Sequence, residues 1–166
     1  KRYQLFLGRY LIFFVMGQIQ ALIIVLGNIY LLHCQVKNPV LFWFAASLTS
    51  FTFTLLIYAL TLSFGDVGKT IAVVMVVIQI AGSSGTFPIE LLPQFFQNVY
   101  LYFPFPYAIN AMREAISGMY EMDYFIYMGK LLIFAAASLL LGLVIRKPFI
   151  PLNHFFEEKM KETKMM

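Results

Sequence analysis

Hydrophobic positions in this chain form long, nearly uninterrupted runs separated by short polar stretches. A membrane-spanning helix needs about 20 mostly apolar residues to cross roughly 30 Å of hydrocarbon. Residues 10–32, 40–64 and 124–145 satisfy this requirement. A fourth run, residues 67–84, is shorter and ends in small residues, but beside three other spans we interpret it as a helix as well. The pattern therefore predicts an all-α integral membrane protein with four transmembrane helices.

The stretch between the third and fourth predicted spans, residues 86–118, breaks this pattern. It holds four of the seven prolines of the chain: Pro88, Pro93, Pro104 and Pro106. Proline breaks helix interiors but is accepted at helix starts. One short helix is therefore expected after Pro93, through Tyr102, and a second from Pro106 to Gly118. Neither is long enough to span a bilayer, so the stretch predicts a re-entrant or interfacial helical hairpin before the last span.

The second of these short helices is amphipathic. Its apolar face is expected to hold Ala108, Ile109, Met112, Ala115 and Ile116, and its polar face Asn110, Arg113, Glu114 and Ser117. Bent backbone at membrane depth is tolerated only where protein or a water-filled cavity covers it. The hairpin therefore requires neighbouring helices, and the small residues of "GSSG" (Gly82–Gly85) allow close approach there.

The composition agrees with a membrane protein. Of the 166 residues, 61% are hydrophobic and 12% charged, with a mean hydropathy of +0.80. Soluble domains have about 45–50% apolar and about 25% charged residues. Cys34 is the only cysteine, which excludes an intrachain disulfide. The chain starts with Lys1 and has no signal peptide, so we expect it to be a fragment of a longer protein.

The lysine and arginine residues of the short connections predict the orientation. Basic residues flank the first span ("KRYQLFLGRY") and follow the last one ("RKP"), and Lys69 lies in the "GDVGK" turn. Four crossings place these segments on one side, which we assign as cytoplasmic. Both ends of the chain are then cytoplasmic. We expect residues 146–166 to form a short solvated cytoplasmic tail, with binding to the membrane surface as the alternative.

Motifs for enzyme chemistry are missing. The sequence holds no H-E-x-x-H, no G-x-S-x-G and no glycine-rich phosphate loop. His33 and His154 stand apart, without further ligands at metal spacing. We therefore expect no enzyme, no catalytic residues, no cofactor and no metal site.

For several polar residues, the sequence allows both a structural and a functional role. Asp66 and Lys69 can form a solvated pair or a functional turn. Arg113 can meet water, or it can lock the hairpin to the loop after the third span, beside Glu90. Polar residues inside the predicted spans can line a substrate path or form hydrogen bonds between helices. These residues are Gln18, Gln20, Asn28 and Gln79.

The motifs "FGDVGK", "QIAGSSGTFPIELLPQFFQ" and "FPFPYAINAMREAISG" resemble the core of the YhgE/Pip family of bacterial membrane proteins. The membrane region of that family is similar to type 2 ABC exporter permeases. The resemblance covers nearly the whole chain, with Ser84 as a small departure where the family more often has glycine. It implies that an earlier span and a large extracellular domain precede the fragment, and it places the chain in the bacterial cytoplasmic membrane.

The resemblance also implies functional positions. A cytoplasmic coupling region would hold Gly8, Arg9, Asp66 and Lys69. The outer hairpin would hold Gly85, Pro88, Glu90, Pro93, Pro104, Pro106, Arg113 and Glu114. The expected partners are the lipid bilayer, a second copy in the full-length form, and a separate ATP-binding subunit or secretion-system subunits. No nucleic acid is expected.

Two functions remain open at this point. The chain can be a permease domain that exports an amphiphile or polymer. It can instead be an anchor that holds an extracellular domain, as a phage receptor or a type VII secretion accessory protein. A polar groove reachable from the bilayer favours the first, and a sealed apolar bundle favours the second.

Overall fold

The computed structural model describes residues 2–82, 85, 88–119 and 122–145, and this part of the chain is helical without any strand. The prediction of an all-α fold is therefore confirmed for these residues. The helices are α1 (Arg2–Leu26), α2 (Pro39–Gly82), α3 (Gln94–Val99), α4 (Phe105–Ser117) and α5 (Asp123–Leu140). Short 3-10 or π turns join or extend them: η1 (Gly27–Leu31), η2 (Ile89–Leu91), η3 (Tyr100–Tyr102) and η4 (Leu141–Ile145). The expected tail lies outside the described residues.

Three helices are long and apolar enough to cross a membrane: Gln4–Leu31, Pro39–Gly82 and Asp123–Leu143. The chain is therefore a multi-pass membrane protein. The first helix starts at Arg2, well before the predicted start at residue 10. The physical reason is that Phe6 and Tyr10 are both buried against α2, so the helical pattern of buried positions continues toward the N-terminus.

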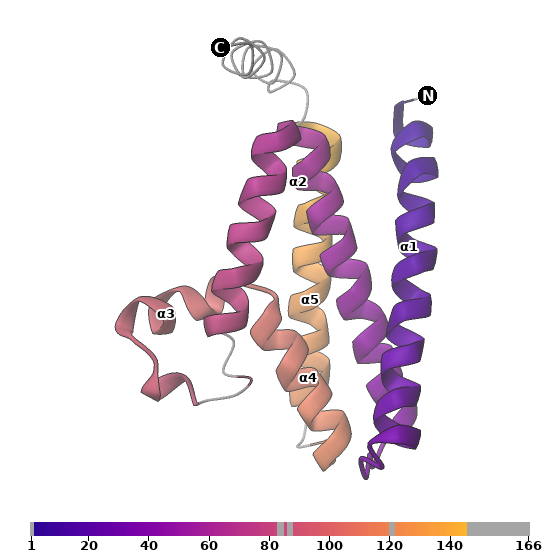
Figure 1. Cartoon of the computed structure of the whole chain (residues 1–166), viewed down its shortest axis with the longest axis vertical. Helices are drawn as coiled ribbons and strands as arrows, with labels where there is room; N and C mark the ends of the chain where they lie inside the picture. Colours follow the sequence, from indigo (N-terminus) through magenta and orange to yellow (C-terminus); the bar gives the residue numbers. More distant parts are fainter. Residues whose placement is uncertain (1, 83–84, 86–87, 120–121, 146–166) are drawn as a thin grey trace.

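The long helix α2 folds back on itself at Gly65. This residue has φ 60° and ψ −130°, a backbone conformation that glycine adopts readily and other residues rarely do. A first arm (residues 39–64) and a second arm (residues 66–82) run in opposite directions on either side of the bend (Figure 1). Gly68 is equally constrained, because a Cβ atom there would overlap the carbonyl oxygen of Leu60. The "GDVGK" turn is thus a bend that requires glycine at two positions: Gly65 for its backbone conformation and Gly68 for its close contact with Leu60.

The elements assemble into a bundle with two distinct ends. The start of α1, the bend of α2 and the end of α5 lie at one end (Figure 1). The α1–α2 connection, the end of α4 and the start of α5 lie at the opposite end, and α3 projects to the side of the bundle (Figure 1). We call these the bend end and the α4 end. The second arm stops part of the way along the bundle, and α4 occupies the remaining length beside α5 (Figure 1).

Small side chains allow the helices to approach closely at the α4 end. One core cluster joins α1, α2, α4 and α5, and most of its members are alanine: Ala21, Val25, Phe42, Ala45, Ala46, Ala111, Ala115 and Tyr124. A second cluster near the bend end contains Phe6, Tyr10, Leu55 and Ala135. Small residues at helix interfaces are typical of membrane bundles, where packing drives association. The small residues therefore allow one face of α4 to pack against the long helices, while Arg113 and Ser117 remain exposed.

Tyrosine hydroxyls connect the helices across the bundle. Tyr10 Oη donates to the Phe51 carbonyl at 3.2 Å, and Tyr124 Oη donates to the Leu41 carbonyl at 2.7 Å. Large apolar side chains on the outside of α1, such as Leu11, Ile12 and Ile23, are exposed in the isolated chain. This arrangement suits a bundle surrounded by lipid, with these tyrosine hydroxyls bonded inside it.

Candidate functional site

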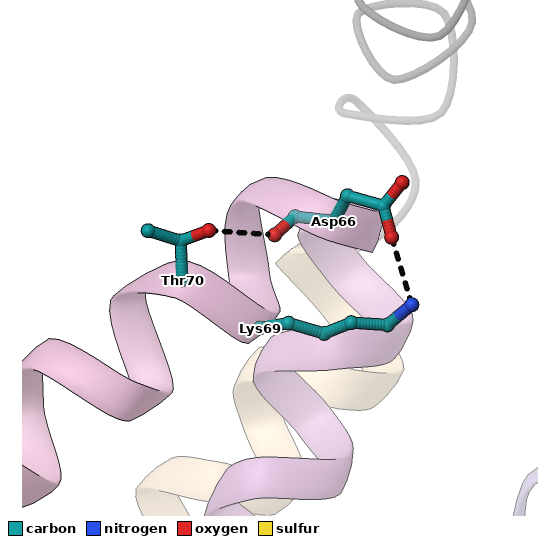
Figure 2. Close-up of polar contacts among 3 residues, drawn as sticks. All are labelled: Asp66, Lys69 and Thr70. Carbon is teal, nitrogen blue, oxygen red and sulfur yellow. Dashed lines mark hydrogen bonds and ion pairs between the residues drawn. The ribbon is translucent and has the colours of Figure 1, made fainter.

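The bend of α2 carries a charged cluster on the surface. Lys69 Nζ lies 2.7 Å from Asp66 Oδ1, and Thr70 Oγ1 donates to the Asp66 carbonyl at 3.2 Å (Figure 2). The side chains of Lys69 and Asp66 are 62% and 56% exposed. An ion pair this exposed contributes little to stability. The structure thus brings the predicted pair together, on a surface that a partner can reach.

The bend is fastened to the end of α5. Ser63, which is fully buried, donates from Oγ to the carbonyl of Leu141 at 3.3 Å. Leu141 begins the π turn η4. Gly142 in the same turn packs so closely that a Cβ atom would lie 2.8 Å from the Phe6 ring. Three helices therefore meet at the bend end.

Gly8 and Arg9 lie within α1, in unbroken helix. Both residues are exposed, and a Cβ atom at Gly8 would meet nothing within 4 Å. The part of the expected coupling region that holds Gly8 and Arg9 is therefore a continuation of the spanning helix. The start of α1 shares the bend end with the turn of α2 (Figure 1).

The outer segment, residues 88–117, contains two short helices separated at Pro104, as the proline spacing predicts. Pro88 precedes η2, Pro93 precedes α3, and Pro104 precedes α4. Pro104 and Pro106 are among the most completely buried side chains of the described chain. Residues 86–87 of the predicted hairpin lie outside the described part. The prolines thus act as helix starts in η2, α3 and α4.

Arg113 links α4 to the chain that follows α2. Its Nη2 donates to the carbonyl of Gly85 at 3.3 Å. The sequence suggested a position beside Glu90, whose side chain is exposed and whose carbonyl accepts from Gln97 at 3.3 Å. Glu114, the neighbour of Arg113, is half-buried on α4. The contact therefore ties α4 to Gly85, which precedes the outer segment.

Tyr107, in the first turn of α4, was not singled out by the sequence pattern. Its hydroxyl donates to the carbonyl of Leu101 at 2.8 Å, which ties η3 to α4. Burial raises the pKa of this hydroxyl, so it remains a protonated donor. Lys130 Nζ lies 4.7 Å from the centre of the same ring. Tyr107 therefore joins the outer segment to α5.

The α1–α2 connection caps the end of α4. The backbone N–H groups of Lys37 and Asn38 donate to the carbonyls of Ile116 and Ala115, at 3.2 and 3.1 Å. Gly118 follows with φ 107°, and a Cβ atom there would lie 2.9 Å from the Lys37 side chain. These bonds satisfy carbonyls that a helix end leaves unpaired. The α4 terminus is thereby held inside the bundle.

The buried face of α4 agrees in part with the one predicted. Ala108 and Ala115 are buried, and Met112 and Ile116 pack half-buried against the core, but Tyr107 and Ala111 belong to the buried face as well. The reason is that α4 packs between α2 and α5 and turns its smallest side chains toward both. Helix spacing alone favours the larger apolar residues and misses this two-sided packing.

The polar residues of the long helices divide into different environments. Gln18 exchanges hydrogen bonds with Ser47 of α2, and Asn28 donates to the Ile24 carbonyl one turn earlier, at 2.9 Å. Gln20 is exposed on α1. Gln79 is buried, with no hydrogen-bond partner among the described residues. Of these four residues, Gln18 therefore fits the expected hydrogen bonding between helices, whereas the Asn28 bond lies within its own helical segment.

Metal binding finds no support in the described ranges. These residues hold no group of three or more His, Cys, Asp and Glu side chains that could bind an ion. Cys34 is a free, exposed thiol in the α1–α2 connection.

The bundle of long apolar helices, with the short helix α4 packed against α2 and α5, is the membrane-embedded part of a multi-pass protein. Residues 1–144 match the family described as "ABC-2 family transporter protein", and the chain belongs to that family. It is a family of transporter membrane domains rather than of catalytic enzymes.

The chain also resembles an individual protein, which is a more specific match than the family. The chain is 33% identical over 115 residues, or 69% of its length, to the uncharacterized protein YhgE of Bacillus subtilis (strain 168). The aligned part is 15% of that protein, so the chain spans a small portion of its relative. No solved structure matches. The resemblance to YhgE and to ABC-2 permeases, expected from the motifs, is confirmed.

Proposed function

We propose that this chain is the permease domain of an exporter in the bacterial cytoplasmic membrane. The observation that carries the proposal is the position of α4, a short helix packed inside one end of a bundle whose family consists of transporter membrane domains. Such a domain rearranges so that an amphiphile or a polymer can leave the cell.

The two arms of α2 support a topology of four crossings. With α1 and α5, they give four roughly antiparallel segments around the bend at Gly65 (Figure 1). Lys69 lies at the bend end, together with Arg9 near the start of α1. The bias of basic residues favours the cytoplasm for this end, and both ends of the chain are then cytoplasmic.

The length of the second arm supports a re-entrant outer segment. At 1.5 Å per residue, residues 66–82 extend about 25 Å, less than the roughly 30 Å of hydrocarbon. The 13 residues of α4 add about 20 Å beside α5. In this proposal α4 completes the second arm from the outer side, with its backbone covered by α2 and α5, and α3 lies at the membrane surface beside it.

Exposed charged residues at the bend end support the proposal that this end contacts a cytoplasmic ATPase. The described chain holds no ATP-binding loop, and the ABC-2 family fits a separate ATP-binding subunit. Asp66 and Lys69 are exposed at this end, and Arg9 is exposed on α1. In the full-length form two copies would form the transport unit, with Arg113 steadying the outer segment through Gly85.

A second function has a specific observation in its favour. The chain aligns with only 15% of its relative, so most of such a protein lies elsewhere. A domain that only anchors a large extracellular part, as a phage receptor or a type VII secretion accessory protein, would fit that proportion. The charged surface of the bend would then have no partner.

Substitution in the full-length protein tests these alternatives. Arg9→Ala and Lys69→Ala should reduce co-purification of an ATPase from native membranes and lower ATP-dependent export. Arg113→Ala should lower export while the ATPase stays bound, because Arg113 belongs to the outer segment. Lys37→Ala is the matched control, since it removes a lysine at the α4 end.

Surface expression must be measured for each variant. Loss of export at normal expression supports the permease. If all variants keep every activity and only deletion of the extracellular part abolishes phage sensitivity or secretion, the anchor function is correct.

A further inference from the structure

Gln79 presents a polar side chain without a partner inside the bundle. It is 1% exposed, and neither Nε2 nor Oε1 has a hydrogen-bond partner among the described residues. Burying an amide without hydrogen bonds is costly, and most buried polar groups are paired. Gln79 lies three residues before Gly82, the last residue of α2, and so about 5 Å from the helix end.

A small cavity adjoins this side chain, between the second arm and the outer segment. Its volume is about 10 Å³, and Phe96, Val99, Tyr100, Phe103 and Pro106 line it together with Gln79. That volume holds one water-sized group. None of the described residues that line it is charged. The cavity therefore suits a single neutral polar group carried on an apolar body.

We propose that Gln79 recognises a neutral hydroxyl in the headgroup of an amphiphile that enters beneath α3. A hydroxyl can donate to Oε1 and accept from Nε2, so one group satisfies both atoms of the amide. A phosphate or an ammonium would lose its hydration among apolar side chains without a countercharge. The inference rests on the proposed permease function and specifies the class of its cargo.

The helix α3 covers the cavity through few contacts. Phe96 approaches closely because Gly82 has no side chain: a Cβ atom there would lie 2.9 Å from Phe96 Cδ1. None of the residues of α3 is buried. Leu91, Phe95 and Leu101 around it are exposed apolar side chains, on which an acyl chain can lie. Displacement of α3 would therefore admit a headgroup from the lipid side.

Protection of an introduced thiol tests this assignment. The full-length protein with Cys34→Ser and Val99→Cys is reconstituted in phosphatidylcholine vesicles, because Val99 lines the cavity. The rate of labelling by N-ethylmaleimide is measured with added 1-monooleoylglycerol, which has free hydroxyls, or methyl oleate, which has none. We expect protection by monooleoylglycerol only. Gln79→Leu should raise the mole fraction needed for half-protection by about tenfold or more.

A stability measurement separates recognition from folding. Gln79→Leu should keep or raise the unfolding temperature, because leucine removes an unpaired buried amide. Gln18→Leu is the matched control: it breaks the bonds to Ser47, so it should lower the unfolding temperature and leave protection unchanged.

The inference is overturned if Gln79→Leu is protected like the parent, if methyl oleate protects equally, or if neither lipid protects. The last result would mean that only a water occupies the cavity. Protection without ATP-dependent export would contradict the permease function and leave the site intact. Export without protection would contradict the site alone.

Discussion

Gln18 and Ser47 join α1 to the first arm of α2 by two hydrogen bonds. Ser47 Oγ donates to Gln18 Oε1 at 2.5 Å, and Gln18 Nε2 donates to the Ser47 carbonyl at 3.2 Å. Gly17 beside them allows the close approach, since a Cβ atom there would lie 2.7 Å from Ser50 Oγ. The amide of Gln18 is thus satisfied by one residue of the neighbouring helix.

Gln18→Leu is expected to destabilise the protein by about 1 kcal/mol, because each interhelical hydrogen bond in a membrane contributes about 0.6 kcal/mol. Thermal unfolding in lipid nanodiscs would measure the loss, and a double-mutant cycle with Ser47→Ala would assign it to the pair. Gln20→Leu is the control, since Gln20 is exposed two residues away. Equal effects of both substitutions would contradict the pairing.

Alanine substitutions test the bend of α2. Gly65→Ala should cost about 1–3 kcal/mol, since side chains rarely adopt its backbone conformation. Gly68→Ala should be at least as harmful, because the added Cβ meets the backbone of Leu60. Gly8→Ala should stabilise α1 by up to about 1 kcal/mol, because Gly8 lies in open space within a helix. Folded yield and unfolding temperature would rank the variants, and a harmless Gly65→Ala would refute the bend.

The Tyr107 hydroxyl provides a test of how η3 is held. Tyr107→Phe removes the bond to the Leu101 carbonyl but keeps the ring beside Lys130. A loss of about 1 kcal/mol is expected, with faster amide hydrogen exchange in residues 100–103 and little change in the centre of α4. Tyr102→Phe, at a residue that is 77% exposed, is the control. Uniform acceleration across α4 would mean that the bond holds the whole helix instead.

The proposed topology can be tested with single thiols in intact cells. Cys34 is exposed in the α1–α2 connection and should react with an impermeant maleimide from outside. In a Cys34→Ser background, Lys37→Cys should react likewise, and Lys69→Cys should react only after permeabilisation. Because Lys37 and Lys69 lie at opposite ends of the first arm, the reverse result would invert the orientation.

Much of the fold follows from patterns that are local in the sequence. Run length and apolar composition predict the long helices, because a bilayer imposes both. The prolines mark the starts of α3 and α4, since proline fixes the backbone there whatever surrounds it. The glycines of "GDVGK" predict a turn because glycine permits backbone conformations that other residues rarely adopt, and Gly65 and Gly68 lie at the tight positions of the bend.

The remaining features depend on tertiary contacts that no local pattern contains. The early start of α1 depends on the burial of Phe6 beside Tyr58, more than fifty residues away. Arg113 meets Gly85 because α4 folds back toward the end of α2. In the sequence, Gln79 cannot be distinguished from Gln18, because both are amides within an apolar run. Only the burial of Gln79 beside a cavity distinguishes the two.

The bend at Gly65 has a consequence for how the protein is made. Because Gly65 is the one non-helical residue inside α2, only the short turn that carries Asp66 and Lys69 separates the two arms. During synthesis, no long soluble segment therefore separates the two arms. We expect both arms to leave the translocation channel together, as a helical hairpin. Insertion of the first arm alone would leave its buried Thr52 and Ser63 facing lipid until α5 is synthesised.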